Sequence, residues 1–156
     1  MKKYYIAYGS NLNVRQMKMR CPTAVILGTA VLNGWELLFK GSKTGSYLTI
    51  EKRRGGKVPV AIWEVTTADE RSLDRYEGYP SFYYKKDIAV KYKGIKTGRQ
   101  HTVTAFVYIM REERPLGIPT DFYLRTCIEG YSVFGFDKLP LTAAYERSWE
   151  VCGYEE

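Results

Sequence analysis

The stretch Tyr8-Gly9-Ser10-Asn11-Leu12, close to the start of the chain, decides the fold. Residues 3–7 before it are rich in aromatic and β-branched side chains, which predicts a strand. Residues 13–20 after it suit a short helix with Asn11 or Asn13 as its N-cap. A strand that turns through small residues into a helix leaves several backbone N–H groups unpaired and pointing the same way. Such groups can bind an anion or a developing oxyanion, although Gly, Ser and Asn also form ordinary turns.

Length and composition predict one domain, spanning residues 1–156, with a substantial core. Apolar residues make up 45% of the chain and aromatic residues 15%, which excludes a disordered protein. No apolar run approaches the ~20 residues that a membrane span needs, and the N-terminal segment is too short for a signal-peptide core. We therefore expect a cytoplasmic protein with no membrane partner. Cys21, Cys127 and Cys152 are far apart and form no Cys-x-x-Cys pair, so we expect them to be reduced and partly buried.

The net charge of +7 is concentrated in residues 40–57 and 85–99. A basic surface attracts small anions and nucleic acid alike. No nucleic-acid-binding signature accompanies it, so we favour a solvated hairpin that protects sheet edges over a nucleic-acid partner. The residues in question are Lys85, Lys86, Lys91, Lys93, Lys96 and Arg99.

The order of the predicted elements indicates an α+β fold, a small mixed β-barrel with peripheral helices. Asn33-Gly34 predicts a tight hairpin turn, residues 40–46 a polar loop, and Pro59 an edge or bulge position. Strands are expected at 3–7, 24–32, 35–39, 47–51, 58–65, 82–93 and 101–110, and helices at 13–20, 67–77, 120–129 and 140–151.

The helix after residue 66 carries the most informative acidic side chain. The spacing of Thr67 and Glu70 predicts a capping box, and Gly78 predicts a left-handed cap at the other end. Leu73 and Tyr76 should face inward, whereas Asp69, Glu70 and Asp74 should be solvated surface charges. Glu77 differs because it lies in the last turn, where the free carbonyl groups and nearby aromatic side chains raise a carboxyl pKa. A carboxylate tuned in this way suits a general acid or base near neutral pH.

Other catalytic chemistry lacks the residues it needs. His101 is the only histidine and begins a predicted strand, so we expect neither a Ser-His-Asp or Cys-His system nor a zinc site. Residues 41–44 lack the glycine-lysine frame of a phosphate-binding loop, and we expect a flexible loop there. Residues 9–11 lack the frame of a nucleophile elbow. Chemistry by a carboxylate and backbone amides remains.

Three segments together resemble the γ-glutamylcyclotransferase family, which includes the AIG2-like proteins. Members carry the Tyr-Gly-Ser-Asn-Leu turn found at residues 8–12. They carry a catalytic Glu in a Leu-Asp-x-x-Glu-Gly segment, matched by residues 73–78 with Glu77 in that place. A later Pro-Ser/Thr-x-x-Tyr-Leu segment resembles residues 119–124, with Tyr123 as the pocket tyrosine. The three matches occur in family order and span most of the chain.

The resemblance implies a small mixed barrel that catalyses cyclisation of γ-glutamyl amides to 5-oxoproline, with release of an amine or amino acid. Glu77 would be the catalytic acid and base, and no metal or cofactor would be required. The implied substrate-binding residues are Tyr8, Gly9, Ser10, Asn11, Leu12 and Tyr123. The partner would be a small γ-glutamyl compound, and a homodimer is left open. Pro59-Val60 departs from the glycine of many members, and residues 38–47, expected near the leaving group, match no subgroup.

Two alternatives remain within the same fold. One is a cyclotransferase of secondary metabolism that removes a γ-glutamyl group from an aminoglycoside; the basic charge of this chain disfavours a cationic substrate. The other is a non-catalytic module that only binds a γ-glutamyl ligand. Retention of Glu77 counts modestly against the second.

Overall fold

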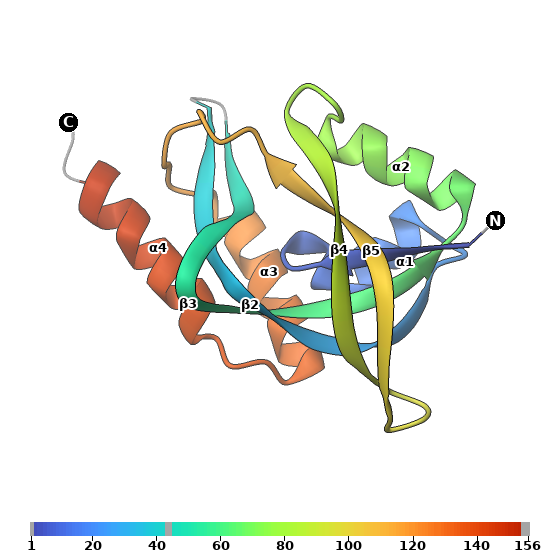
Figure 1. The fold of residues 1–156 in the computed structure, drawn as a ribbon. Helices are drawn as coiled ribbons and strands as arrows, with labels where there is room; N and C mark the ends of the chain where they lie inside the picture. The colour runs from blue at the N-terminus through green and yellow to red at the C-terminus, as the bar shows by residue number, and fades with distance from the viewer. Residues whose placement is uncertain (1, 43–44, 154–156) are drawn as a thin grey trace.

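A closed β-barrel forms the body of the protein in a computed structural model that describes residues 2–42 and 45–153 (Figure 1). The described strands follow the order β1-β3-β2-β4-β5 around the barrel. The strands are β1 (Lys3–Ala7), β2 (Val25–Ser42), β3 (Gly45–Val65), β4 (Tyr83–Gly94) and β5 (Gln100–Met110). A 3-10 turn, η1 (Ser10–Leu12), precedes the helices α1 (Val14–Arg20), α2 (Thr67–Glu77), α3 (Asp121–Phe134) and α4 (Leu139–Cys152).

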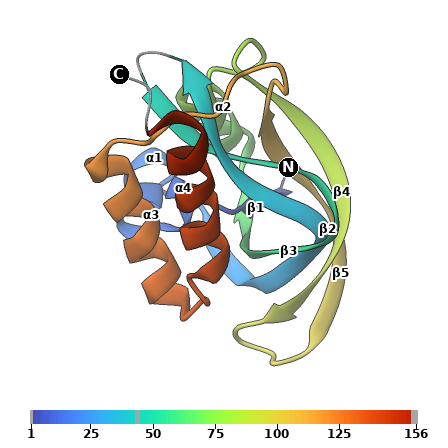
Figure 2. The same cartoon turned by 90° about the vertical axis from the view of Figure 1, so that its left-hand side faces the viewer.

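The barrel is mixed because β1 runs antiparallel to β3 and parallel to β5. β2 and β4 close it through two residue pairs only, Gly28 with Gly94 and Thr29 with Lys93. A side chain at Gly28 would place its Cβ 2.0 Å from the carbonyl oxygen of Lys93, so this closure depends on glycine. The predicted α+β class and mixed barrel with peripheral helices are confirmed. Figure 2 shows α3 and α4 on one side of the barrel and β4 and β5 on the other.

The hairpin predicted at Asn33-Gly34 is wrong, because β2 continues through both residues. Gly34 has φ = +84° and lies at a register shift, where it alone faces the four residues 53–56 that bulge from β3. Gly34 therefore lies within a long strand, opposite a bulge of β3, and its positive φ has no steric cost. The predicted loop 40–46 is also too long, because the two strands pair as far as Ser42 and Gly45. Residues 43 and 44, the second half of the segment 41–44 that was compared with a phosphate-binding loop, lie outside the described residues.

Pro59 occupies an edge position, as predicted. It pairs with Val31 of β2, whereas β1 meets β3 only from Ala61 to Val65. Pro59 therefore has a strand neighbour on one side, where its missing N–H breaks no ladder.

Helix α2 has the predicted bounds, but its capping box lies one residue earlier than expected. Thr66 is the N-cap, and its hydroxyl and the Asp69 side chain form the capping box that was expected of Thr67 and Glu70. Asp69 and Glu70 are buried, so the prediction that they are solvated is wrong. Gly78 ends the helix with φ = +65°, as predicted. Leu73 is fully buried as expected, but Tyr76 is 42% exposed.

Helix α3 begins after Thr120, as predicted, but it does not end at Gly130. The helix continues to Phe134 and is capped by Gly135, which has φ = +68°. A Cβ on Gly130 would approach Leu12 to 2.7 Å, so glycine allows α3 to pack closely against η1. The predicted last helix is confirmed as α4, which packs on β2.

The described cysteines are free: Cys21 and Cys127 are buried and Cys152 is intermediate, as expected. His101 lies near the start of β5 and stacks on Tyr92, in agreement with a structural role. None of the helices in the described ranges has the length and apolar character required to cross a bilayer. The outer end of the basic β4–β5 hairpin points away from α2 in both views (Figures 1 and 2).

Candidate active site

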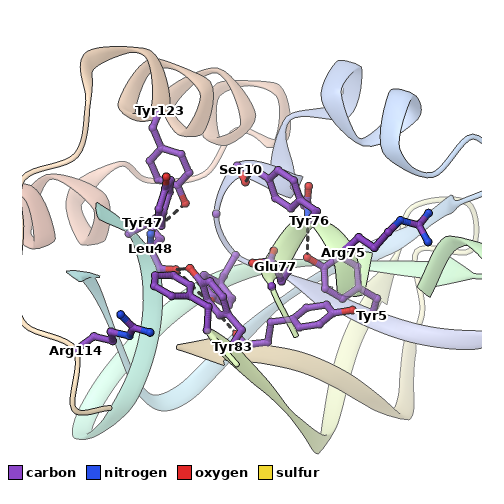
Figure 3. Close-up of a pocket in the computed structure, with 16 residues that line it drawn as sticks. Tyr5, Ser10, Tyr47, Leu48, Arg75, Tyr76, Glu77, Tyr83, Arg114 and Tyr123 are labelled. Atoms are coloured by element: carbon purple, nitrogen blue, oxygen red, sulfur yellow. Dashed lines mark hydrogen bonds between the residues drawn. The ribbon is translucent and has the colours of Figure 1, made fainter. Parts of the chain in front are cut away.

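A pocket of about 460 Å³ opens where the bend after β1 meets the C-terminal end of α2 (Figure 3). Strands β3, β4 and β5, the loop after β5 and helix α3 complete its walls. Its lining is dominated by aromatic side chains and contains a single carboxylate, that of Glu77. The lining residues are Tyr5, Tyr8, Gly9, Ser10, Asn11, Tyr47, Leu48, Arg75, Tyr76, Glu77, Gly78, Phe82, Tyr83, Tyr108, Arg114 and Tyr123.

The bend that lines this pocket contains unpaired backbone amides. The N–H of Leu12 donates to the carbonyl oxygen of Gly9 at 3.0 Å, which forms the 3-10 turn. The N–H groups of Gly9, Ser10 and Asn11 have no acceptor among the described residues. Asn13, not Asn11, is the N-cap of α1, because its side chain accepts from the N–H of Gln16. The bend therefore has the donors that were predicted for an anion or oxyanion.

Polar contacts tie the bend to α2, β1 and α1. Ser10 Oγ lies 2.9 Å from the Tyr76 hydroxyl, and Asn11 Nδ2 donates to the Tyr5 hydroxyl at 2.9 Å. Arg20 donates to Asn11 Oδ1 at 2.5 Å, and its guanidinium lies 3.5 Å from the centre of the Tyr76 ring. Tyr76 is thus held in place despite its exposure, and the amides of the bend keep a fixed position relative to the last turn of α2.

Glu77 lies among these groups, at the centre of the side chains shown in Figure 3. Burial among the pocket side chains raises the pKa of Glu77 to about 8, and the positive charge of Arg20 opposes that rise. Among the described residues, no side chain forms a hydrogen bond or ion pair with its carboxyl group. The residue remains partly accessible through the pocket. Glu77 is therefore an unpaired carboxyl group that can exchange a proton near neutral pH.

The wall next to Gly9 is built from tyrosines that hold Leu48 of β3. Tyr83 donates to the carbonyl oxygen of Leu48 at 2.8 Å, and the N–H of Leu48 donates to the Tyr123 hydroxyl at 3.0 Å. Tyr8 donates to the carbonyl oxygen of Tyr108 at 2.7 Å. Burial raises the pKa of Tyr8, Tyr83 and Tyr123 well above the usual value, so these hydroxyls stay neutral.

A network of charges lies behind the pocket and fixes α2 to the barrel. Lys85 Nζ lies 2.8 Å from Glu70 and 2.9 Å from Asp74, and Lys3 Nζ lies 2.7 Å from Glu70. Tyr108, which lines the pocket, donates to Asp74 at 2.6 Å. The network joins α2 to β1, β4 and β5, and thereby sets the position of the turn that carries Glu77.

The structure brings six of the seven predicted site residues to one pocket. Glu77, Tyr8, Gly9, Ser10, Asn11 and Tyr123 line it. Leu12 does not, because its side chain is fully buried under α3 and its N–H is paired within the turn. Its position does not support the predicted contact with a ligand. Pro59 and Val60, where this chain departs from the glycine of many family members, do not line the pocket either.

Several lining residues were not predicted as site residues: Tyr5, Tyr47, Tyr83, Tyr108, Arg75, Tyr76 and Arg114. The strand tyrosines carried a signal, because aromatic residues at alternate positions of a barrel strand share the inner face. Arg114 carried none, since it follows the end of β5 in an irregular loop whose course depends on tertiary contacts.

The fold and the site define a class: a small mixed barrel with a pocket lined both by a carboxyl group of raised pKa and by a bend with unpaired backbone amides. The family described as "Gamma-glutamyl cyclotransferase, AIG2-like" matches residues 5–125, and the chain belongs to this family. The resemblance drawn from the three sequence segments is confirmed.

Proteins named gamma-glutamylcyclotransferase are among the similar sequences. The protein of Bos taurus is 36% identical over 87 residues, which cover 51% of this chain and 46% of that protein. The protein of Homo sapiens is 29% identical over 119 residues, which cover 71% of this chain and 62% of that protein. The chain thus spans about half to three fifths of the curated relatives it matches.

Solved structures show the same fold. A structure of a protein named "Gamma-glutamyl cyclotransferase" covers 95% of this chain and 86% of that chain, with a TM-score of 0.75 and 25% identity. The structure of an uncharacterized Homo sapiens protein covers 94% of this chain and 86% of its own, with a TM-score of 0.71 and 28% identity.

Proposed function

We propose that this protein is a cyclotransferase that converts a γ-glutamyl amide into 5-oxoproline and a free amine or amino acid. The names of its relatives support this activity. The observation that carries the proposal is the placement of Glu77, with a pKa of about 8, and the unpaired amides of Gly9, Ser10 and Asn11 at one pocket.

In this mechanism Glu77 moves the proton that cyclisation requires. The α-amine of the substrate is mostly protonated near pH 7 and cannot attack until it loses a proton. The Glu77 carboxylate accepts that proton, and the freed nitrogen forms a bond to the γ-carbonyl carbon. As the tetrahedral intermediate collapses, the original amide C–N bond breaks and Glu77 returns a proton to the leaving nitrogen. The ring nitrogen, which carries two hydrogens after the attack, releases one proton to solvent or to the departing amine, so that 5-oxoproline leaves as a neutral lactam. A pKa near the working pH suits both transfers.

The bend supplies the anion site of the proposed mechanism. Its free N–H groups can receive the negative charge that develops on the former carbonyl oxygen, or hold the α-carboxylate of the substrate. The attack is intramolecular, so a pocket that holds the glutamyl chain in a ring-like pose contributes much of the rate.

Product analysis in H₂¹⁸O tests the reaction type. The protein is incubated with γ-glutamyl amino acids, γ-glutamyl amines and a γ-glutamyl aminoglycoside, and the products are identified by mass spectrometry. Cyclisation yields 5-oxoproline without solvent oxygen, whereas hydrolysis yields glutamate with one ¹⁸O atom. Release of 5-oxoproline from at least one compound is expected. Labelled glutamate would contradict cyclisation, and binding without turnover across the panel would favour the non-catalytic module.

A further inference from the structure

Arg114 places an unneutralised positive charge in the wall of the pocket. It lies in the loop between β5 and α3, where its backbone N–H donates to the carbonyl oxygen of Arg111 at 3.1 Å. The side chain is half-buried, and its guanidinium lies 4.6 Å from the centre of the Phe82 ring. Within residues 2–42 and 45–153, no carboxylate pairs with it and no side chain accepts a hydrogen bond from it. Its donors are therefore available to a ligand.

The other arginines near the pocket are differently engaged. Arg20 donates to Asn11 and Gln16 and stacks on Tyr76, so its donors serve the protein. Arg75 is exposed and donates to Ser72 of its own helix at 3.3 Å. In Figure 3, Arg114 and Arg75 lie on opposite sides of Glu77. Arg114 thus lies at a different end of the pocket from Arg75.

Aromatic side chains connect Arg114 to the rest of the pocket. The rings of Phe82 and Tyr47 meet edge to face at 6.2 Å, and those of Tyr47 and Tyr123 at 5.2 Å. All three rings line the same cavity. They form a continuous wall that leads from Tyr123, beside Gly9, to Arg114. An apolar wall that ends in a guanidinium fits a group with a hydrocarbon portion and a terminal carboxylate.

From this arrangement we infer that Arg114 binds a carboxylate on the leaving group and so selects γ-glutamyl amino acids or peptides over γ-glutamyl amines. The inference rests on the proposed function, in which the bend and Glu77 hold the glutamyl part and leave the Arg114 end for the departing part. The planar guanidinium can hold a carboxylate through two parallel hydrogen bonds, and its stacking on Phe82 fixes the plane in advance. A cationic leaving group would be repelled there.

Matched substrates test the inference. γ-Glutamyl-alanine and γ-glutamyl-alaninamide differ only in the terminal carboxylate, and both would give 5-oxoproline. For the wild type we expect kcat/KM to favour the carboxylate about tenfold, the size of a partly exposed charge-assisted interaction. Arg114→Gln should remove this preference through KM, with kcat little changed and the amide substrate unaffected. Arg114→Glu should reverse the preference.

Two control variants separate Arg114 from the general positive field. Arg99→Gln removes one charge from the exposed hairpin outside the pocket and should keep the preference. Arg75→Gln removes a charge from the other side of the pocket and should also keep it. An equal loss of preference in Arg75→Gln, or an unchanged preference in Arg114→Gln, would overturn the inference while leaving cyclisation intact.

A binding measurement keeps the two proposals distinguishable. Calorimetric titration of the inactive Glu77→Gln variant with the two substrates should show tighter binding of the carboxylate form. The double variant Glu77→Gln/Arg114→Gln should bind both equally. If the wild type releases no 5-oxoproline but this binding difference is present, the proposed reaction fails and the carboxylate site stands. Equal binding by the single variant overturns the carboxylate site.

Discussion

Two glutamates on one helix, Glu70 and Glu77, are placed in opposite environments. Burial alone would raise the pKa of Glu70, but the ammonium groups of Lys3 and Lys85 outweigh it and hold the pKa below its usual value. Glu77, seven residues later at the C-terminal end of α2, has no such partner and its pKa rises to about 8. The same side chain is a structural anion at one position and a proton-exchanging group at the other.

This contrast shows that burial by itself does not make a carboxylate reactive. Glu70 is only 9% exposed, yet its pair of lysines keeps it ionised. What distinguishes Glu77 is burial without compensation, next to a cavity that a ligand can enter. The comparison can be tested by exchanging each group for its neutral isostere.

Glu77→Gln should produce the largest effect. Loss of the proposed acid and base should lower kcat for 5-oxoproline release roughly 10³-fold, while circular dichroism and ligand binding stay close to wild type. Glu70→Gln is the matched control, and at a temperature where it is folded its kcat should remain within a few-fold of wild type. Near-wild-type turnover by Glu77→Gln would remove Glu77 from the mechanism.

Glu70→Gln should instead lower stability. The substitution leaves Lys3 and Lys85 without their shared partner, and we expect the free energy of unfolding to fall by about 2–3 kcal/mol at pH 7. The lowered pKa of Glu70 means that its ionised form stabilises the fold above the usual pKa of 4.5, and this contribution fades as the pH falls below it. Urea unfolding at pH 7 and pH 3.5 measures both values. A deficit that does not shrink in acid would contradict the ion-pair explanation.

Glu77→Gln should have the opposite effect on stability. The raised pKa means that folding favours the protonated carboxyl, so its contribution is fully present below pH 4.5 and is lost as the pH rises through about 8. Because the pocket admits solvent, we expect the variant to exceed wild type by about 2 kcal/mol at pH 9 and to equal it near pH 4.5. Urea unfolding across this range checks the trend. A constant difference across the range would argue against a raised pKa.

Thr66→Ala should give the smallest effect. It removes the hydroxyl that accepts from the N–H of Asp69 in the capping box, which should cost about 1 kcal/mol of unfolding free energy. The kcat should not change, because the cap is at the opposite end of α2 from Glu77. Ser72→Ala, another hydroxyl removal on α2, is the control and should change stability by less than about 0.5 kcal/mol. A large loss of kcat in Thr66→Ala would show that the two ends of the helix are not independent.

Much of the barrel was predictable because strand, helix and cap signals are local. Thr120, Gly78 and the alternating apolar residues of β5 act through neighbours in the sequence. The predictions failed where contacts between distant segments determine the local conformation. Asn33-Gly34 has the sequence of a tight turn, but pairing of β2 with β3 on both sides of Gly34 keeps it within a strand. Gly130 resembles a helix end, but its lack of a side chain serves the contact with Leu12.

The residues of the candidate site show the same difference between local signals and tertiary contacts. Residues 8–11 and Glu77, which line the pocket, could be predicted because they belong to short contiguous segments. Glu70 was misassigned as solvated, since its two lysine partners come from β1 and β4. Arg114 and Tyr108 reach the pocket only through the closure of the barrel and the path of the loop after β5.

The central claim is that Glu77 is an unpaired carboxyl group that titrates near neutral pH beside the amides of the bend. A ¹³C NMR titration of the protein labelled at glutamate side-chain carboxyls, with Glu77→Gln to assign the resonance, measures this directly. The structure predicts a midpoint near 8. A midpoint near the ordinary value of 4.5 would contradict it.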